Sequence, residues 1–149
     1  MKKTFENVTM ECWDHSADLR FGVKPPFLCV KGGPEACDVM LTMLDELSGL
    51  RAPDQRSMTL KNSPRPNACR KIKFIISPPD DELTEMSLSK ESDTAIFEFT
   101  LAGLKKFREA IVQWGQGKDD FSIHPNRLSH SARDRQSGEV WFWTPLTEP

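Results

Sequence analysis

The sequence lacks a membrane span, a secretory signal and an excess of positive charge. A membrane-spanning helix needs about 18 or more consecutive apolar residues, and no such run occurs in the 149 residues. The first residues are charged and polar with no apolar stretch behind them, so we expect no signal peptide. The formal net charge is −2, unlike the broadly basic character of nucleic-acid-binding domains. These absences predict a cytoplasmic protein that binds neither a membrane nor nucleic acid.

Motifs of the common enzyme classes are also missing. The chain contains neither the Gly-x-Ser-x-Gly turn of α/β-hydrolases nor the His-Glu-x-x-His helix of metalloproteases. Gly32-Gly33 has the glycines of a phosphate-binding loop, but Pro34 follows and lacks the N–H that an anion would need. We therefore expect no cofactor, and the sequence identifies no catalytic residue.

The cysteines form no zinc-binding framework. They are Cys12, Cys29, Cys37 and Cys69. Cys12-x-x-His15 has the spacing of a ligand pair, but a second close pair is absent, so we expect no metal site. Cys12 falls on the apolar side of a predicted strand and Cys37 lies beside a helical apolar stripe, which favours buried, small hydrophobic side chains. We expect four free thiols in a reducing compartment.

Short strands dominate the expected secondary structure. Period-two alternation and short apolar runs predict strands at 7–13, 19–23, 27–31, 58–61, 70–77, 85–90, 95–99, 121–124 and 140–143. Only two helical patterns interrupt them, and the length favours one domain over residues 1–149. The order predicts an α+β fold, with a largely antiparallel sheet and two helices packed on one of its faces.

The first helix is indicated by its start signal and its apolar stripe. Gly33 fits the N-cap, and Pro34 fits the first helical position, where a missing N–H costs nothing. The helix should end near Ser48-Gly49. Its stripe consists of Ala36, Met40, Met43, Leu44 and Leu47.

The second helix has the clearest pattern in the chain. Thr100 is a suitable N-cap, because its hydroxyl can accept a hydrogen bond from the first turn. Gly115 and Gly117 predict its end. The expected buried stripe consists of Leu101, Leu104, Phe107, Ile111 and Trp114.

Two histidines are candidate bases. His15 lies next to Asp14, in a polar stretch that also fits a hairpin tip. His124 ends a predicted strand close to Asp119 and Asp120, where a partly buried structural histidine is the other interpretation. A small enzyme that uses His124 or His15 with nearby carboxylates is therefore the alternative function.

Charge is distributed unevenly along the middle of the chain. The segment from Arg51 to Lys73 contains seven basic residues and one acid. The segment from Asp80 to Glu98 contains seven acids and one lysine. Neighbouring antiparallel strands of opposite charge would pair across the sheet. The other interpretation is a polar surface that attracts a charged protein partner.

A Trp-Phe-Trp strand lies close to the C-terminus. In a strand over 140–143, Trp141 and Trp143 point to one side, and Phe142 points to the other. Such a strand is either covered on both faces by this chain, or its outer face binds something. The three aromatic residues form, with Phe121 and His124, a candidate interaction or ligand patch. Self-pairing of an apolar edge strand would give a homodimer with its contact near Phe142 or the tryptophans.

Aromatic and glycine patterns of the last third resemble small bacterial proteins of uncharacterised function. These patterns are Phe99-Thr100-x-x-Gly103-Leu104-x-x-Phe107, Trp114-x-x-Gly117-x-Asp119-x-Phe121-x-Ile123 and Val140-Trp141-Phe142-Trp143. The resemblance implies a bacterial cytoplasmic protein and transfers no site residue. From the size and the lack of motifs we expect a protein-binding or accessory protein, of which an immunity-type protein is one form.

Overall fold

The computed structural model describes residues 4–14, 28–47, 54–78, 85–116, 121–123, 127–128 and 140–143. Within these ranges the chain forms two helices and ten strands, which confirms the predicted α+β class. The predicted strand at 19–23 lies outside the described residues.

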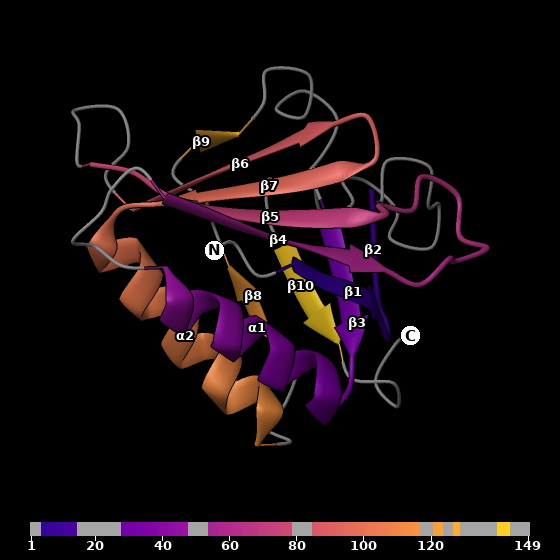
Figure 1. Ribbon diagram of the computed structural model, residues 1–149, viewed down its shortest axis with the longest axis horizontal. Coiled ribbons are helices and arrows are strands. Elements are labelled where there is room, and N and C mark those ends of the chain that lie inside the picture. The colour runs from indigo at the N-terminus through magenta and orange to yellow at the C-terminus, as the bar shows by residue number, and fades with distance from the viewer. Residues whose placement is uncertain are drawn as a thin grey trace.

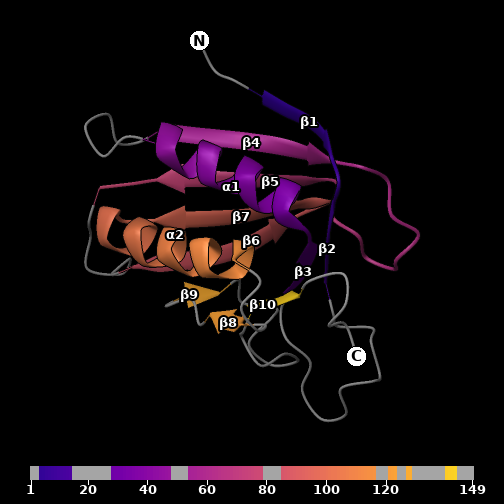
Figure 2. The same cartoon turned by 90° about the horizontal axis from the view of Figure 1, so that it is seen from below.

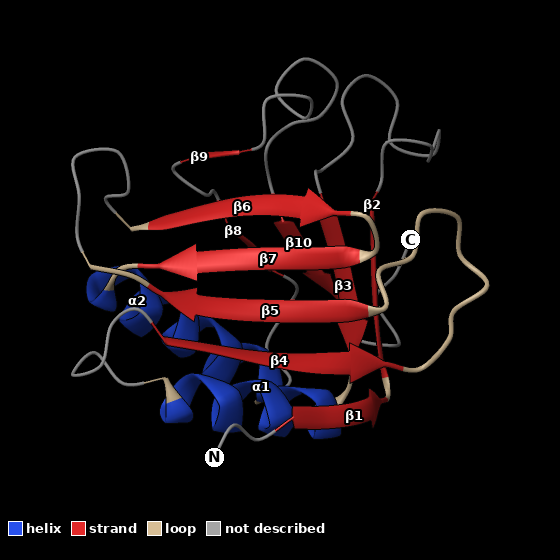
Figure 3. Ribbon diagram, turned by 45° about the horizontal axis from the view of Figure 1, so that its top comes forward, coloured by secondary structure: helices blue, strands red, loops and turns tan. Residues whose placement is uncertain are grey.

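A six-stranded sheet forms one layer of the molecule (Figure 3). Its strands, in spatial order, are β1 (Thr4–Val8), β4 (Asp54–Leu60), β5 (Lys71–Ile76), β7 (Thr94–Phe99), β6 (Met86–Glu91) and β9 (Arg127–Leu128). Strand β7 lies between β5 and β6, antiparallel to β6 but parallel to β5. Strands β6 and β7 form a hairpin joined through Ser92. Strand β6 lies on the outer side of β7, so the two central strands of the sheet are β5 and β7, and these two run parallel.

A second sheet has four strands, in the order β2 (Met10–Asp14), β3 (Leu28–Gly32), β10 (Val140–Trp143) and β8 (Phe121–Ile123). Strand β10 pairs in parallel with β3 and antiparallel with β8. The single strand predicted at 7–13 is in fact β1 and β2, which belong to different sheets. The break is at Thr9, and just before it the register of β1 is irregular around Asn7, whose φ of 52° is one that asparagine tolerates. Both sheets are thus mixed rather than largely antiparallel.

Helices α1 (Pro34–Glu46) and α2 (Leu101–Gly115) lie side by side on one face of the six-stranded sheet (Figures 1 and 2). The predicted start of α1 is confirmed, with Gly33 as N-cap and Pro34 in the first turn. Its predicted stripe is buried, and the helix ends at Glu46, slightly earlier than expected. Within the described residues, no helix has both the length and the apolar character needed to cross a membrane.

The predicted start of α2 is also confirmed, because the Thr100 hydroxyl accepts a hydrogen bond from the Gly103 N–H at 3.3 Å. One member of its predicted stripe is wrong: Leu101 is 45% exposed. Each helical residue turns by about 100°, so Leu101 lies about 100° from the centre of the buried arc. The other four stripe residues are buried.

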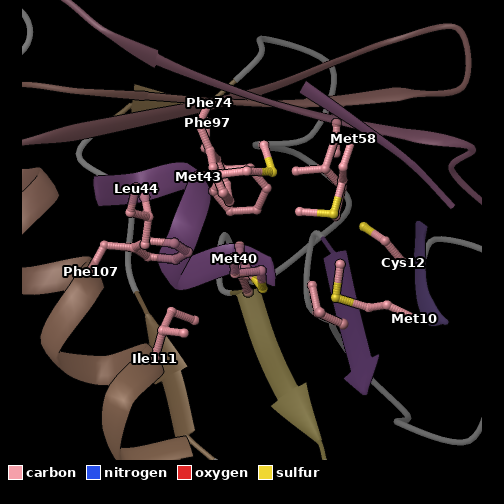
Figure 4. Close-up of a cluster of buried hydrophobic side chains, with 14 of the residues drawn as sticks. Met10, Cys12, Met40, Met43, Leu44, Met58, Phe74, Phe97, Phe107 and Ile111 are labelled. Carbon is pink, nitrogen blue, oxygen red and sulfur yellow. The ribbon is translucent and has the colours of Figure 1, made fainter. Parts of the chain in front are cut away.

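The main core fills the space between the helices and the two sheets (Figure 4). Phe107 of α2 is at its centre, with its ring centroid 5.0 Å from that of Phe99 and 5.9 Å from that of Phe142. Phe99 belongs to the six-stranded sheet and Phe142 to the four-stranded sheet. One side chain of α2 therefore joins both sheets into a continuous core.

Candidate functional site

The predicted patch around the Trp-Phe-Trp strand is largely interior where the structure describes it. Phe142 is fully buried in the main core, and Trp143 is 4% exposed on the other face of β10. Trp141 and Phe121 lie in β10 and β8, but their side chains are outside the described part, and His124 and His15 are outside it altogether. Phe142 and Trp143 therefore do not offer an accessible contact surface, contrary to the expectation for a binding patch. The reason is that other parts of this chain cover Phe142 on one face of the strand and Trp143 on the other.

A small hydrophobic cluster on the outer face of the four-stranded sheet consists of Trp13, Cys29 and Trp143; we call it the tryptophan cluster. The two indoles lie 5.8 Å apart between ring centroids, at an interplanar angle of 50°. The guanidinium carbon of Arg65 lies 3.8 Å from the centroid of the Trp13 ring. This arrangement is a cation–π contact, in which the planar cation covers the indole face.

An acidic residue holds Arg65 in this position. Arg65 Nε donates to Glu11 Oε2 at 2.6 Å, and the Ser63 hydroxyl donates to the same oxygen at 2.7 Å. Partial burial raises the pKa of Glu11, but these two hydrogen bonds and the charges of Arg65 and Lys31 outweigh it and lower the pKa. Glu11 is therefore ionised at neutral pH, and it fixes the segment before β5 against strand β2.

The same segment brings two cysteines together. Asp14 N–H donates to Asn67 O at 3.1 Å, and Cys69 N–H donates to Cys12 O at 2.7 Å, on either side of an antiparallel bridge between Trp13 and Ala68. In this register Cys12 lies directly opposite Cys69. Both are buried, as the sequence predicted for Cys12. Their proximity was not predicted, because it depends on a contact between residues far apart in the sequence.

The two thiols differ in acidity. The Cys12 thiol donates a hydrogen bond to the Cys69 sulfur, and this bond together with burial raises the pKa of Cys12. The same hydrogen bond lowers the pKa of Cys69 despite its burial, with help from the Lys90 ammonium. Lys90 Nζ is held 3.8 Å from Asp14 Oδ2. Cys69 is thus the thiol that ionises more readily.

Among the described residues, no three His, Cys, Asp or Glu side chains gather closely enough to hold a metal ion. Cys37 is buried as predicted, and its thiol donates to the Ile111 carbonyl at 3.1 Å.

The ion pairs also differ from the expected pairing of the basic and acidic segments. Arg56 binds Glu46 of α1 and Asp54, and Glu85 binds Lys106 of α2. Strand β5 of the basic segment does lie beside β7 of the acidic segment, but the two run in parallel and the register places Lys71 beside Thr94 and Lys73 beside Ile96.

Both helices lie on one face of the six-stranded sheet, and residues of the strands form its other face. We call this other face the open face; its partly exposed side chains are Ser57, Thr59, Lys71, Lys73, Ile75, Ser87, Ser89, Thr94, Ile96 and Glu98. Figure 3 shows these strands with both helices behind them. The register places Lys73 beside Ile96 and Ile75 beside Glu98. Sequence alternation along β5 and β7 is the signal that could have identified this face.

Comparison with known proteins yields no matching family model, no similar curated protein and no similar solved structure. The resemblance of the last third to small bacterial proteins stays a prediction.

Proposed function

We propose that this chain is a small accessory protein that binds another protein through its open face. The observation that supports this proposal is the helix-free face of the parallel pair β5 and β7 at the centre of the sheet. Parallel strands are usually covered on both faces, whereas antiparallel strands tolerate one wet face. A partner that covers β5 and β7 would complete the layer that the two helices form on the other side.

The side chains of the open face indicate which chemical groups a partner would present to it. Ile75 and Ile96 are diagonal neighbours on adjacent strands and offer an apolar centre. The Glu98 carboxylate already accepts a hydrogen bond from Ser77 at 2.7 Å. Within the described part of the chain, no ion pair engages Lys71 or Lys73. Two lysines and one glutamate lie at this centre, so its net charge is positive and the partner presents carboxylates around an apolar side chain.

The chemistry of the open face favours a protein over a nucleic acid. Single-stranded nucleic acids are held on aromatic side chains that stack with the bases. The open face has two lysines but no aromatic residue among its described side chains. A surface of isoleucine, lysine, glutamate and short hydroxyl side chains suits a flat protein contact instead.

Affinity capture from native lysate with matched variants tests the proposal. The baits are the wild-type chain, Lys73→Glu, Ile96→Thr and Lys105→Glu, the last being the same charge reversal on the exposed side of α2. We expect one protein to bind the wild type and Lys105→Glu, and to bind both open-face variants at least about tenfold more weakly. Purified partner and titration calorimetry then check direct binding, which should weaken as salt is raised.

Three results would contradict the proposal. The first is a partner that binds all four baits equally, which would place the contact elsewhere. The second is another copy of this chain as the only occupant, which sedimentation at tens of micromolar would reveal as a homodimer. The third is RNA recovered in place of a protein.

A further inference from the structure

A second observation, independent of the open face, concerns the cysteines at the edge of strand β2. Directly opposed, hydrogen-bonded residues of antiparallel strands have Cα atoms about 5.5 Å apart. Disulfides join Cα atoms about 4.4–6.8 Å apart. Cys12 and Cys69 are opposed next to the Trp13–Ala68 bridge and share one backbone hydrogen bond, from Cys69 N–H to Cys12 O; both side chains belong to the main core, so they point to the same side. The backbone therefore already has a geometry that a disulfide can bridge.

We propose that Cys12 and Cys69 form a redox pair that a peroxide converts from two thiols into a disulfide. The Cys69 thiolate attacks one peroxide oxygen; the O–O bond breaks, hydroxide leaves, and Cys69 becomes a sulfenic acid. The Cys12 sulfur then attacks the Cys69 sulfur, the S–O bond breaks, and the hydroxyl leaves as water with the Cys12 proton. The two thiols lose two electrons and two protons, and hydrogen peroxide is reduced to two molecules of water.

The surroundings of the two sulfur atoms indicate which cysteine attacks the peroxide and which one then forms the disulfide with it. Cys69 accepts the hydrogen bond of the Cys12 thiol and lies near the Lys90 ammonium, and both interactions stabilise a thiolate. Cys12 is 1% exposed and keeps its proton, so it acts as the resolving thiol. Because Cys69 is only 3% exposed, a small oxidant such as hydrogen peroxide reaches it more readily than a bulky thiol reagent.

The other cysteines are placed differently. Cys29 belongs to the tryptophan cluster on the opposite face of the four-stranded sheet, and the Cys37 thiol is bound to the Ile111 carbonyl. A disulfide between Cys12 and Cys69 would tie the segment that carries Arg65 to strand β2. Closing so long a loop restricts the unfolded chain, so the oxidised form should be the more stable one.

Peroxide treatment of the purified, folded chain tests the redox pair. We expect thiol titration in denaturant to fall from four thiols to two, and peptide mapping to identify a Cys12–Cys69 link. Methionine oxidation does not affect this titration. We also expect the oxidised chain to melt about 5 °C or more above the reduced chain, and dithiothreitol to reverse both changes.

Cysteine variants give the matched controls. Cys37→Ala should still lose two thiols, whereas Cys69→Ala and Cys12→Ala should form no intramolecular disulfide. If either of these two variants fails to fold, the wild-type peptide map still decides. A link that involves Cys29, a disulfide between two chains, sulfonic acid at Cys69 without a link, or four unreacted thiols would each overturn the proposal.

Discussion

The main core and the tryptophan cluster exclude water by different means. Around the main core, two amphipathic helices and two sheets bury a group of phenylalanine and methionine side chains. The tryptophan cluster is formed by three side chains, and a charged group, the Arg65 guanidinium, covers part of it. One core depends on regular secondary structure, and the other depends on a loop held by an ion pair.

This difference determines what each region tolerates. A charged side chain introduced into the main core would contact neither water nor an oppositely charged group. The free-energy cost of removing it from water is therefore not offset. At the tryptophan cluster, a charge already lies on an aromatic face and is neutralised by Glu11. We therefore expect substitutions in the main core to have large effects and substitutions at the polar cover to have small ones.

The largest effect is expected for Phe142→Glu. The substitution removes a buried ring and places a carboxylate beside Phe107 and Trp114. Loss of the ring alone costs about 3–5 kcal/mol, and burial of an unpaired charge costs several more. Together these exceed much of the usual stability of about 5–15 kcal/mol. Circular dichroism and a thermal melt should show an unfolded chain, and a cooperatively folded variant would show that this face of β10 is not interior.

Phe107→Ala should destabilise the fold by about 3–5 kcal/mol, because it empties the site that joins the two sheets. Urea denaturation measures the change, and Leu101→Ala is the control. Leu101 lies on the same helix but is 45% exposed, so its loss should cost about 0.5 kcal/mol or less. Similar losses for both variants would contradict the arrangement of the helix on the sheet.

Gly103→Ala should destabilise by about 1–3 kcal/mol, although alanine is the better helix former. A Cβ at this position would lie 1.9 Å from the Glu85 carbonyl oxygen, which belongs to the backbone and cannot rotate away. Gly33→Ala is the comparison, since nothing lies within 4 Å of the added atom there. A gain in stability for Gly103→Ala, measured by urea denaturation, would mean that α2 can shift away from Glu85.

Local patterns predicted the main core well. The caps at Gly33 and Thr100 and the helical stripes involve residues close in sequence, and they were confirmed except at Leu101. Strand β4 begins earlier than predicted. Its polar residue Arg56 faces inward, where it binds Glu46 at the end of α1.

The tryptophan cluster could not be predicted in the same way. Strand β10 was expected, but its parallel pairing with β3 joins segments more than a hundred residues apart. Nothing local places Arg65 on Trp13 or Cys69 opposite Cys12. These contacts arise because β1 and β2 lead the chain from one sheet into the other, and the segment before β5 pairs with β2 through the Trp13–Ala68 bridge.

The smallest effect is expected for Arg65→Gln, which removes the cation from Trp13 and the ion pair with Glu11. The partly exposed pair and the cation–π contact together contribute about 1 kcal/mol. The lowered pKa of Glu11 makes this contribution depend on pH. It is present above the ordinary pKa of a glutamate and is lost as pH falls through the lowered value.

Urea denaturation should therefore show the wild type more stable than Arg65→Gln at pH 7, with a difference that shrinks below about pH 4. Arg70→Gln, a nearby exposed arginine, should change stability by less than about 0.5 kcal/mol at either pH. A difference for Arg65→Gln that stays constant down to pH 3 would show that packing on Trp13, rather than the bond to Glu11, accounts for the stabilisation.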